Sequence, residues 1–280
     1  MKLAHWLTFL SLLLSNVAQA QISEIPPAPS LAAKSYVLYD FTSNQILVSQ
    51  NGNDRVDPAS LTKLMTAYLV FDAIRQNRLS PDSMIVPPAS ALRLEAKESR
   101  MFIERGKSVS VNELLRGLIV QSGNDAARVL AIATAGSEEI FVRQMNQEAQ
   151  RLGMLDTRFT NPTGLPQEGH YSTARDLVVL ASAILRDFPE HYPLYSMREY
   201  TYNNITQPNH NRLLWMDPFV DGVKTGYSES AGFCLVASAV RGERRLLSVL
   251  IGATSDNLRA TESQRLLNYG LKHFEAARLF

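Results

Sequence analysis

DPASLTKLMTAYLVFDAI, residues 57–74, predicts a long and mostly apolar helix, and the rest of the fold can be worked out from it. Its first turn is expected to carry Ser60 and Lys63. A helix that is apolar on nearly every side is normally buried among other elements. Burial disfavours the charged form of a lysine. The segment therefore raises a question of chemistry as well as of folding.

Segments on either side of this helix predict a sheet built from both ends of the chain. SYVLYDFTSNQILVSQN, residues 35–51, alternates in polarity and turns at residues 42–44, which is typical of a β-hairpin. AGFCLVASAVRGERRLLSVLIGAT, residues 231–254, has two apolar runs around a turn at residues 241–243. We expect both pairs to be antiparallel strands that meet in one sheet.

The region between these strands has helical patterns. Ser110 and Glu113 form a capping box before one helix, and Thr173 precedes another. Further helices are expected over residues 137–153 and 256–272. The prediction is an α/β (α+β) fold, with an antiparallel sheet flanked by helices, a helical lobe, and a cleft between the lobes.

Composition narrows the classes of protein. The chain has 280 residues, 45% of them hydrophobic and 20% charged, which suits one large globular domain or two smaller ones. Lys and Arg number 28 against 27 Asp and Glu, without a basic run, so nucleic acid is not expected as a partner. The single cysteine, Cys234, is expected to be a buried apolar residue. The five histidines lack a metal-binding spacing, so no metal is expected.

The N-terminus, MKLAHWLTFLSLLLSNVAQA, has the features of an export signal. Lys2 precedes an apolar core over residues 7–14, and small residues stand at Ala18 and Ala20. The core is much shorter than the roughly 20 residues of a membrane-spanning helix. We expect cleavage after Ala20, a Pro-rich linker over residues 21–31, and a folded unit over residues 32–280.

Ser60 and Lys63 make chemical sense as a nucleophile and its base. A serine hydroxyl needs a neighbouring group to take its proton, and a buried lysine can be neutral enough to do so. Spacing i to i+3 places both side chains on one face of the helix. An S-x-x-K would occur by chance roughly once in such a chain, so the motif alone is weak.

Two further motifs strengthen the interpretation. Ser122-Gly123-Asn124 lies between two helical segments, and Lys224-Thr225-Gly226 leads into the C-terminal strand pair. Each has an ordinary structural alternative, as an interhelix turn or a solvated strand end. All three motifs together, in this order and behind an export signal, favour a single catalytic site.

The set resembles the penicillin-recognising serine acyltransferases, whose S-x-x-K, S-x-N and K-T-G elements line one cleft. Within them the chain is most similar to low-molecular-mass penicillin-binding proteins, the serine D-alanyl-D-alanine carboxypeptidases of peptidase family S11. The resemblance runs from about Ala32 to the C-terminus and includes NPTGLP and HYSTARDL. It implies the serine β-lactamase/DD-peptidase-like fold, a periplasmic location and no cofactor.

The resemblance also implies roles for the first two motifs. Ser60 would attack the penultimate D-Ala carbonyl of a peptidoglycan stem peptide ending in D-Ala-D-Ala, with Lys63 as base. Ser122 would relay a proton to the leaving amine, and Asn124 would bind Lys63 or the substrate backbone. Lys224, as a second cation, would lower the pKa of Lys63. β-Lactams would be covalent inhibitors.

The third motif would bind the substrate. Lys224 and Thr225 would hold its terminal carboxylate, and Gly226 would leave room for the peptide along the strand. The backbone N–H groups of Ser60 and Tyr227 would form the oxyanion hole.

Two departures from well-known relatives bear on specificity and anchoring. His210 stands where an arginine is expected, and Tyr227 stands where some relatives have histidine. The C-terminal β-rich module and amphipathic membrane anchor of many relatives are expected to be absent, as in a naturally short form or a truncated copy. Membrane association is left open.

Three alternatives stay open at this point: a serine β-lactamase, a DD-endopeptidase of the same fold, and a catalytically silent exported binding protein. Class A β-lactamases use a glutamate between the second and third motifs, in a context like E-x-x-L-N. No candidate in that interval has this context: Glu138, Glu139, Glu148, Glu168, Glu190 and Glu199.

Overall fold

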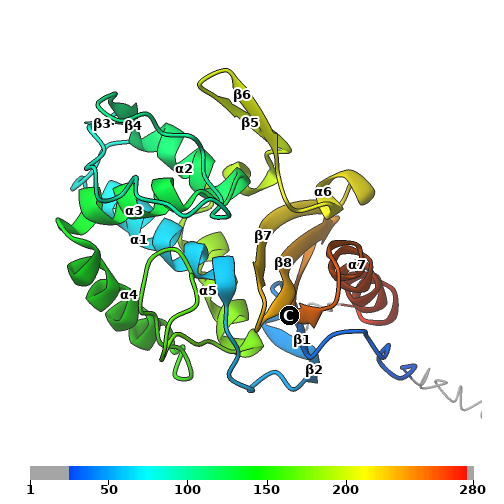
Figure 1. Ribbon diagram of the computed structural model, residues 1–280. Coiled ribbons are helices and arrows are strands. Elements are labelled where there is room, and N and C mark those ends of the chain that lie inside the picture. The colour runs from blue at the N-terminus through cyan, green and yellow to red at the C-terminus, as the bar shows by residue number, and fades with distance from the viewer. Residues whose placement is uncertain (1–24, 276–280) are drawn as a thin grey trace, which may run out of the picture.

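A computed structural model describes residues 25–275, and its main sheet joins the two ends of that region (Figure 1). Five antiparallel strands follow the order β2-β1-β9-β8-β7. Their bounds are β1 (Ser35–Asp40), β2 (Gln45–Gln50), β7 (Val220–Ser228), β8 (Gly232–Arg241) and β9 (Arg244–Ala253). β1 pairs with β9 from Ser35 opposite Ile251 to Asp40 opposite Leu246. The expectation that both ends of the chain share one sheet is therefore confirmed.

Helices form most of the rest of the structure. The longer ones are α1 (Lys63–Arg75), α2 (Val111–Val120), α3 (Asn124–Ala135), α4 (Glu138–Leu152), α5 (Ala174–Asp187) and α7 (Asp256–His273). The short elements are η1 (Ala59–Thr62), η2 (Tyr192–Ser196), α6 (Leu213–Met216), β3 (Met84–Ile85), β4 (Val109–Ser110), β5 (Glu199–Tyr202) and β6 (Ile205–Pro208). β3 pairs with β4 and β5 with β6, each as a separate two-stranded sheet.

Side-chain caps begin the helices where the sequence predicted them. Ser110 accepts from the backbone N–H of Glu113, whose carboxylate accepts from the N–H of Ser110, so the capping box is complete. Ser137 and Thr173 cap α4 and α5 in the same way, at the third residue of each helix. α4 ends at Leu152, and the next residue, Gly153, has a φ of 85°, the left-handed conformation that glycine adopts most readily.

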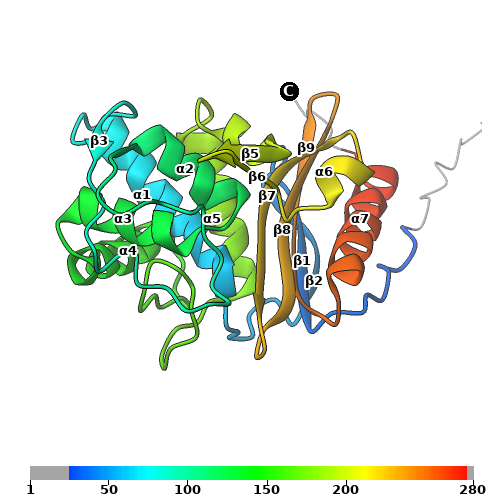
Figure 2. The same cartoon turned by 45° about the horizontal axis from the view of Figure 1, so that its top comes forward.

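The sheet separates two apolar cores. Figure 2 shows α7 covering one face, while the helical lobe of α1 to α5 lies against the other. Leu246 and Leu250 on β9 pack toward α7, whereas Val249 and Ile251 belong to the core of the helical lobe. This alternation follows from the two-residue period of a strand that is buried on both faces. Cys234 is fully buried, as expected.

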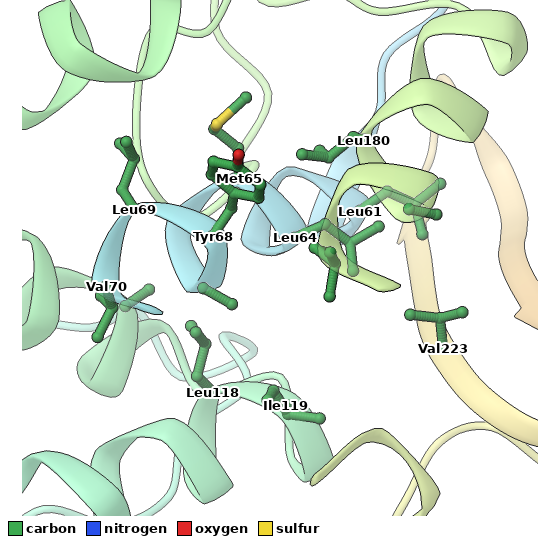
Figure 3. Packing of buried hydrophobic residues seen from close by; sticks show 14 of the residues in the cluster. Leu61, Leu64, Met65, Tyr68, Leu69, Val70, Leu118, Ile119, Leu180 and Val223 are labelled. Atoms are coloured by element: carbon green, nitrogen blue, oxygen red, sulfur yellow. The ribbon is translucent and has the colours of Figure 1, made fainter. Parts of the chain in front are cut away.

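α1 lies at the centre of the helical lobe. Figure 3 shows residues of η1 and α1 among Leu118 and Ile119 of α2, Leu180 of α5 and Val223 of β7. Leu64 and Met65 of α1 are completely buried. Burying such a side chain contributes roughly 1.5–3 kcal/mol, so this packing holds the start of α1 against β7.

The start of α1 differs from the expectation. Ser60 and Lys63 do not share the first turn of one α-helix, because Ala59–Thr62 is a 3₁₀ turn and Lys63 is the first residue of α1. Residues i and i+3 are eclipsed in a 3₁₀ turn, whereas they are offset in an α-helix. The tighter turn therefore aligns the two side chains more directly than the predicted helix would.

Candidate active site

The nucleophile turn, residues 57–60, is held from three sides. Asp57 Oδ1 accepts a hydrogen bond from the backbone N–H of Ala59 at 2.8 Å. Asp57 Oδ2 accepts from the hydroxyls of Ser228 and Ser230 at 2.6 and 2.7 Å, which ties the turn to the end of β7. A Cβ on Gly164 would lie 1.9 Å from the Ala59 carbonyl oxygen, so only glycine fits there. The backbone before the serine is thus fixed by tertiary contacts.

Lys63 lies beneath this turn with its amine against the serine. Its Nζ is 3.0 Å from Ser60 Oγ and donates to the Thr163 carbonyl at 2.5 Å. Lys63 is only 1% exposed. Burial lowers the pKa of Lys63 to about 7, while the carboxylates of Glu98 and Asp125 oppose that shift. At neutral pH a substantial fraction of this amine is therefore unprotonated and able to accept a proton.

The second motif lies at the junction of α2 and α3. Ser122 adopts a φ of 58°, which is uncommon for a residue other than glycine, and its buried Oγ has no protein partner among the described residues. Asn124 is the first residue of α3, and its Nδ2 donates to Glu98 Oε2 at 2.8 Å. The predicted contact of Asn124 with Lys63 or the substrate backbone stays a prediction, because the hydrogen bond to Glu98 uses only the Nδ2 group of Asn124.

The third motif lies on β7, the edge strand of the sheet next to η1. Lys224 and Thr225 are buried, and the side chain of Tyr227 is about half exposed. Lys224 Nζ donates to the carbonyl of Thr225 at 3.0 Å. A Cβ on Gly226 would lie 3.2 Å from the Pro58 carbonyl and 3.3 Å from Leu61. The glycine thus lets β7 approach the nucleophile turn, a requirement that the sequence argument did not consider.

Burial lowers the pKa of both lysines, but the charged groups around them differ. The pKa of Lys224 is lowered well below its ordinary value, first by burial and then by the charges of Lys63 and Arg259. The pKa of Lys63 responds instead to burial, to the nearby carboxylates and to Arg128. Repulsion between two cations is mutual, so the prediction that Lys224 lowers the pKa of Lys63 stays a prediction.

The part of the cleft next to β7 also depends on Arg259, which no sequence motif indicated. Arg259 lies on α7, pairs with Asp256 at 2.6 Å, and is 7% exposed. It donates to the carbonyls of Gly226 and His210, each at 3.2 Å. His210 lines the cleft. Loss of hydration around the imidazole, and then the charges of Lys224 and Arg259, lower the pKa of His210 to about 4. His210 is therefore neutral at physiological pH.

These elements enclose one continuous cleft of about 1630 Å³ between the helical lobe and the sheet. Six of the eight predicted site residues line it: Ser60, Ser122, Asn124, Thr225, Gly226 and Tyr227. The side chains of Lys63 and Lys224 lie buried behind this lining. Sequence reasoning missed Glu98 and the Thr163 carbonyl. Only Thr163 had a sequence signal, since it lies within NPTGLP.

The described residues contain no group of three or more His, Cys, Asp or Glu side chains that could hold a metal ion. The site consists of the buried amine of Lys63 beside the hydroxyl of Ser60 at the floor of the cleft. Such a pair can activate the hydroxyl for attack on a carbonyl carbon.

Comparison with known proteins agrees with this geometry. The family model of D-alanyl-D-alanine carboxypeptidase matches residues 21–255. D-alanyl-D-alanine carboxypeptidase DacC of Escherichia coli is 43% identical over 253 residues, which cover 89% of this chain and 63% of DacC. DacD of the same organism is 43% identical over 270 residues, which cover 95% of this chain and 70% of DacD. The chain thus spans about two thirds of the length of these relatives.

Solved structures show the same fold. Penicillin-binding protein 5 from Haemophilus influenzae superposes with a TM-score of 0.86 at 42% identity, covering 88% of this chain and 72% of that one. Penicillin-binding protein D2 from Listeria monocytogenes, in its ampicillin-bound form, gives 0.80 at 32% identity, covering 88% of this chain and 100% of that one. The fold, the three motifs and the extent of the match show that the chain belongs to the D-alanyl-D-alanine carboxypeptidase family.

Proposed function

We propose that this protein is a serine-type D-Ala-D-Ala carboxypeptidase that removes the terminal D-Ala from peptidoglycan stem pentapeptides and is acylated by penicillins. The observation that carries the proposal is the 3.0 Å contact between Lys63 Nζ and Ser60 Oγ at the floor of the cleft. Relatives that are 40–43% identical are named for this activity. The Listeria neighbour was solved with ampicillin bound.

In the first step, the neutral amine of Lys63 takes the proton of Ser60 while Oγ attacks the carbonyl carbon of the penultimate D-Ala. The resulting oxyanion accepts hydrogen bonds from the backbone N–H groups of Ser60 and Tyr227. The C–N bond then breaks, and the amine of the terminal D-Ala leaves with a proton relayed through Ser122. The Ser122 hydroxyl, which has no partner within the part of the chain that the structure describes, can form these transient hydrogen bonds.

Lys224 and Thr225 bind the terminal carboxylate of the substrate. In the free enzyme, burial and the charges of Lys63 and Arg259 hold the pKa of Lys224 well below its ordinary value. A carboxylate placed beside it favours the protonated, positively charged form of this amine. The unpaired edge of β7 lets the peptide align as an added strand.

In the second step, water attacks the acyl-serine ester and Ser60 is regenerated, with Lys63 again as the base. A penicillin forms the same ester when its lactam C–N bond opens, but its leaving amine stays attached to the acyl group. It therefore remains in the cleft as a covalent inhibitor.

Specific observations weigh against the alternatives. None of the six glutamates considered for a class A lactamase role lines the cleft. The intact Ser60 and Lys63 pair argues against a silent binding protein, because a buried amine is costly to keep without a function. The DD-endopeptidase would use the same nucleophile, so only the substrate test below distinguishes it.

We also propose export to the periplasm, with signal cleavage after Ala20, a linker over residues 21–31 and a catalytic unit over residues 32–280. The signal segment lies outside the described residues, and the sequence pattern alone supports it. Within residues 25–275, no helix has the length and apolar character needed to cross a bilayer.

The test is intact-protein mass spectrometry after incubation with benzylpenicillin, alongside release of D-Ala from a pentapeptide ending in D-Ala-D-Ala. We expect the mass of one whole penicillin to be added and D-Ala to be released. Ser60→Ala should prevent both, whereas Ser99→Ala should keep the adduct, because Ser99 lines the cleft but its hydroxyl makes no hydrogen bond to the described residues.

Other outcomes would support the alternatives. An adduct that disappears within seconds, without D-Ala release, would indicate a lactamase. Cleavage of crosslinked peptide dimers in preference to the pentapeptide would indicate an endopeptidase. The absence of any adduct would favour the binding protein.

A further inference from the structure

The carboxylate of Asp57 joins two segments that are far apart in the chain, the nucleophile turn and the end of β7. Oδ1 accepts from the backbone N–H of Ala59 at 2.8 Å, within the turn. Oδ2 accepts from the hydroxyls of Ser228 and Ser230 at 2.6 and 2.7 Å. Ser228 is the last residue of β7. We call these three side chains, Asp57, Ser228 and Ser230, the Asp57 clamp. Each carboxylate oxygen is thus engaged on a different segment.

Each end of the Asp57 clamp lies next to one amide of the proposed oxyanion hole. Ala59 directly precedes Ser60, and Ser228 directly follows Tyr227. The N–H of Ser60 belongs to the peptide unit that starts at the Ala59 carbonyl, so a rotation at Ala59 turns that N–H. β7 is the edge strand of the five-stranded sheet, so strand pairing holds it from one side only. The clamp supports its end from the other segment.

The backbone of Ala59 needs such support. Ala59 has a φ of 47°, a left-handed conformation that is uncommon for a residue other than glycine. A residue keeps this conformation only when its surroundings hold it. The hydrogen bond from its N–H to Asp57 is one such contact, and the end of β7 supplies another. A Cβ on Gly226 would lie 3.4 Å from the Ala59 Cβ, so the turn and β7 are in close contact.

We propose that Asp57 is a positioning residue, which sets the spacing of the two oxyanion-hole N–H groups, those of Ser60 and Tyr227. The inference rests on the proposed function and adds a residue outside the three motifs. Two donors stabilise an oxyanion fully only when both reach the place where its charge develops. The negative charge of a carboxylate would by itself disfavour a nearby oxyanion. The benefit of Asp57 therefore comes from geometry.

The first experiment measures the second-order rate of acylation by benzylpenicillin. Asp57→Ala should slow acylation about 10- to 30-fold, which is less than the roughly 10²- to 10³-fold loss when a whole donor is removed. Ser228→Ala should slow the wild type about fivefold, within the range for coupled neighbours. In the Asp57→Ala background it should change the rate less than about twofold, because the partner of the hydroxyl is already gone. Multiplicative effects of the two substitutions would overturn the proposal.

The second experiment observes the oxyanion hole itself. The ester carbonyl of the acyl-enzyme occupies that hole, and hydrogen bonds to its oxygen lower the C=O stretching frequency. Infrared difference spectra with benzylpenicillin that carries ¹³C in the lactam carbonyl isolate this band. Asp57→Ala should move the band to higher wavenumber, because the two donors no longer fit the oxygen together. A band at the wild-type position would show that Asp57 only supports the fold.

Asp57→Asn and Asp54→Ala separate geometry from charge. In Asp57→Asn the side-chain oxygen can still accept from Ala59, and the amide nitrogen can donate to the hydroxyl of Ser228. This variant should keep the wild-type band and a rate within about threefold of wild type. If it behaved like Asp57→Ala, charge would be the cause and the proposal would fail. Asp54 is exposed and its carboxylate makes no hydrogen bond to the described residues, so Asp54→Ala should change neither measurement.

Two controls keep the outcomes separate. Unfolding midpoints and far-UV circular dichroism identify a variant that does not fold. If Asp57→Ala does not fold, Ser228→Ala replaces it in the infrared measurement, with the same direction of shift expected. If the wild-type protein forms no penicillin adduct, the proposed function fails. A wild-type adduct whose band is unchanged in the clamp variants overturns this inference alone.

Discussion

The two walls of the cleft each bury a lysine but surround it with different charges. On the wall formed by the helical lobe, Lys63 lies near the carboxylates of Glu98 and Asp125, and its pKa stays at about 7. On the wall formed by the sheet, Lys224 lies near Lys63 and Arg259, and its pKa is lowered well below the ordinary value. Both side chains are almost fully buried. Residue type and burial alone therefore do not decide what a lysine does.

The difference matches two kinds of chemistry. A base needs a pKa close to the working pH, and nearby carboxylates prevent burial from lowering that of Lys63 too far. An anion site needs unbalanced positive charge, and Lys224 with Arg259 supplies it beside β7. Lys63 also has two hydrogen-bond acceptors, Ser60 Oγ and the Thr163 carbonyl, whereas within residues 25–275 Lys224 donates only to a carbonyl of its own strand.

The largest effect is expected from removing the base. Lys63→Met should reduce the acylation rate by about 10²- to 10⁴-fold, the usual contribution of general base catalysis. In the wild type the rate should rise with pH through about 7, because only the neutral amine of Lys63 accepts the serine proton. The rate of penicillin adduct formation against pH measures both.

The same variant should unfold at a higher temperature. Between about pH 7 and 10.5 the unfolded chain binds a proton at Lys63 that the folded chain does not, so wild-type stability rises with pH in this window. The advantage of Lys63→Met should therefore be largest below pH 7 and disappear toward pH 10.5. Lys97→Met, at an exposed lysine of the same cleft, should change neither rate nor stability. Wild-type-like acylation by Lys63→Met would remove this lysine from the role of base.

A smaller effect is expected on the opposite wall. Lys224→Ala should lower kcat/KM for a peptide ending in D-Ala-D-Ala about 10- to 100-fold, which corresponds to a charged hydrogen bond of roughly 1.5–3 kcal/mol. The same peptide with an amidated C-terminus should lose much less, because it offers no carboxylate to Lys224. Steady-state kinetics with both peptides measure the difference, and Lys97→Ala is the control. Equal losses with the two peptides would place carboxylate binding elsewhere.

The smallest effect is expected at His210, which is neutral at physiological pH. His210→Arg would place a permanent cation beside the same anion site and should lower KM for the acidic peptide up to about fivefold, with kcat unchanged. The pKa of His210 is about 4, so the wild type should gain affinity only in that acidic range. KM values at pH 7 for the peptide with a free C-terminal carboxylate and for its amidated form measure the effect of His210→Arg. A gain shared by both peptides would contradict an electrostatic cause.

Several features of the fold and of the site could be predicted because their causes are local. Ser110 and Thr173 begin helices through side-chain caps, which depend on neighbours three residues away. The burial of Lys63 follows from the apolar run around it. The roles of Glu98 and Arg259 could not be predicted, since the contacts that place them at the site are with Asn124 and Gly226, 26 and 33 residues away along the chain.

The sequence by itself determined the chemical groups, their order along the chain, and the placement of strands at its ends with helices between them. Helix periodicity, strand alternation and capping are local properties, so a single chain displays them. Only the tertiary structure decided the pKa shifts of the two lysines and the hydrogen-bond partner of Asn124. Those depend on charges, carbonyls and buried surface that distant segments bring together within a few ångströms, and no spacing in the sequence encodes such distances.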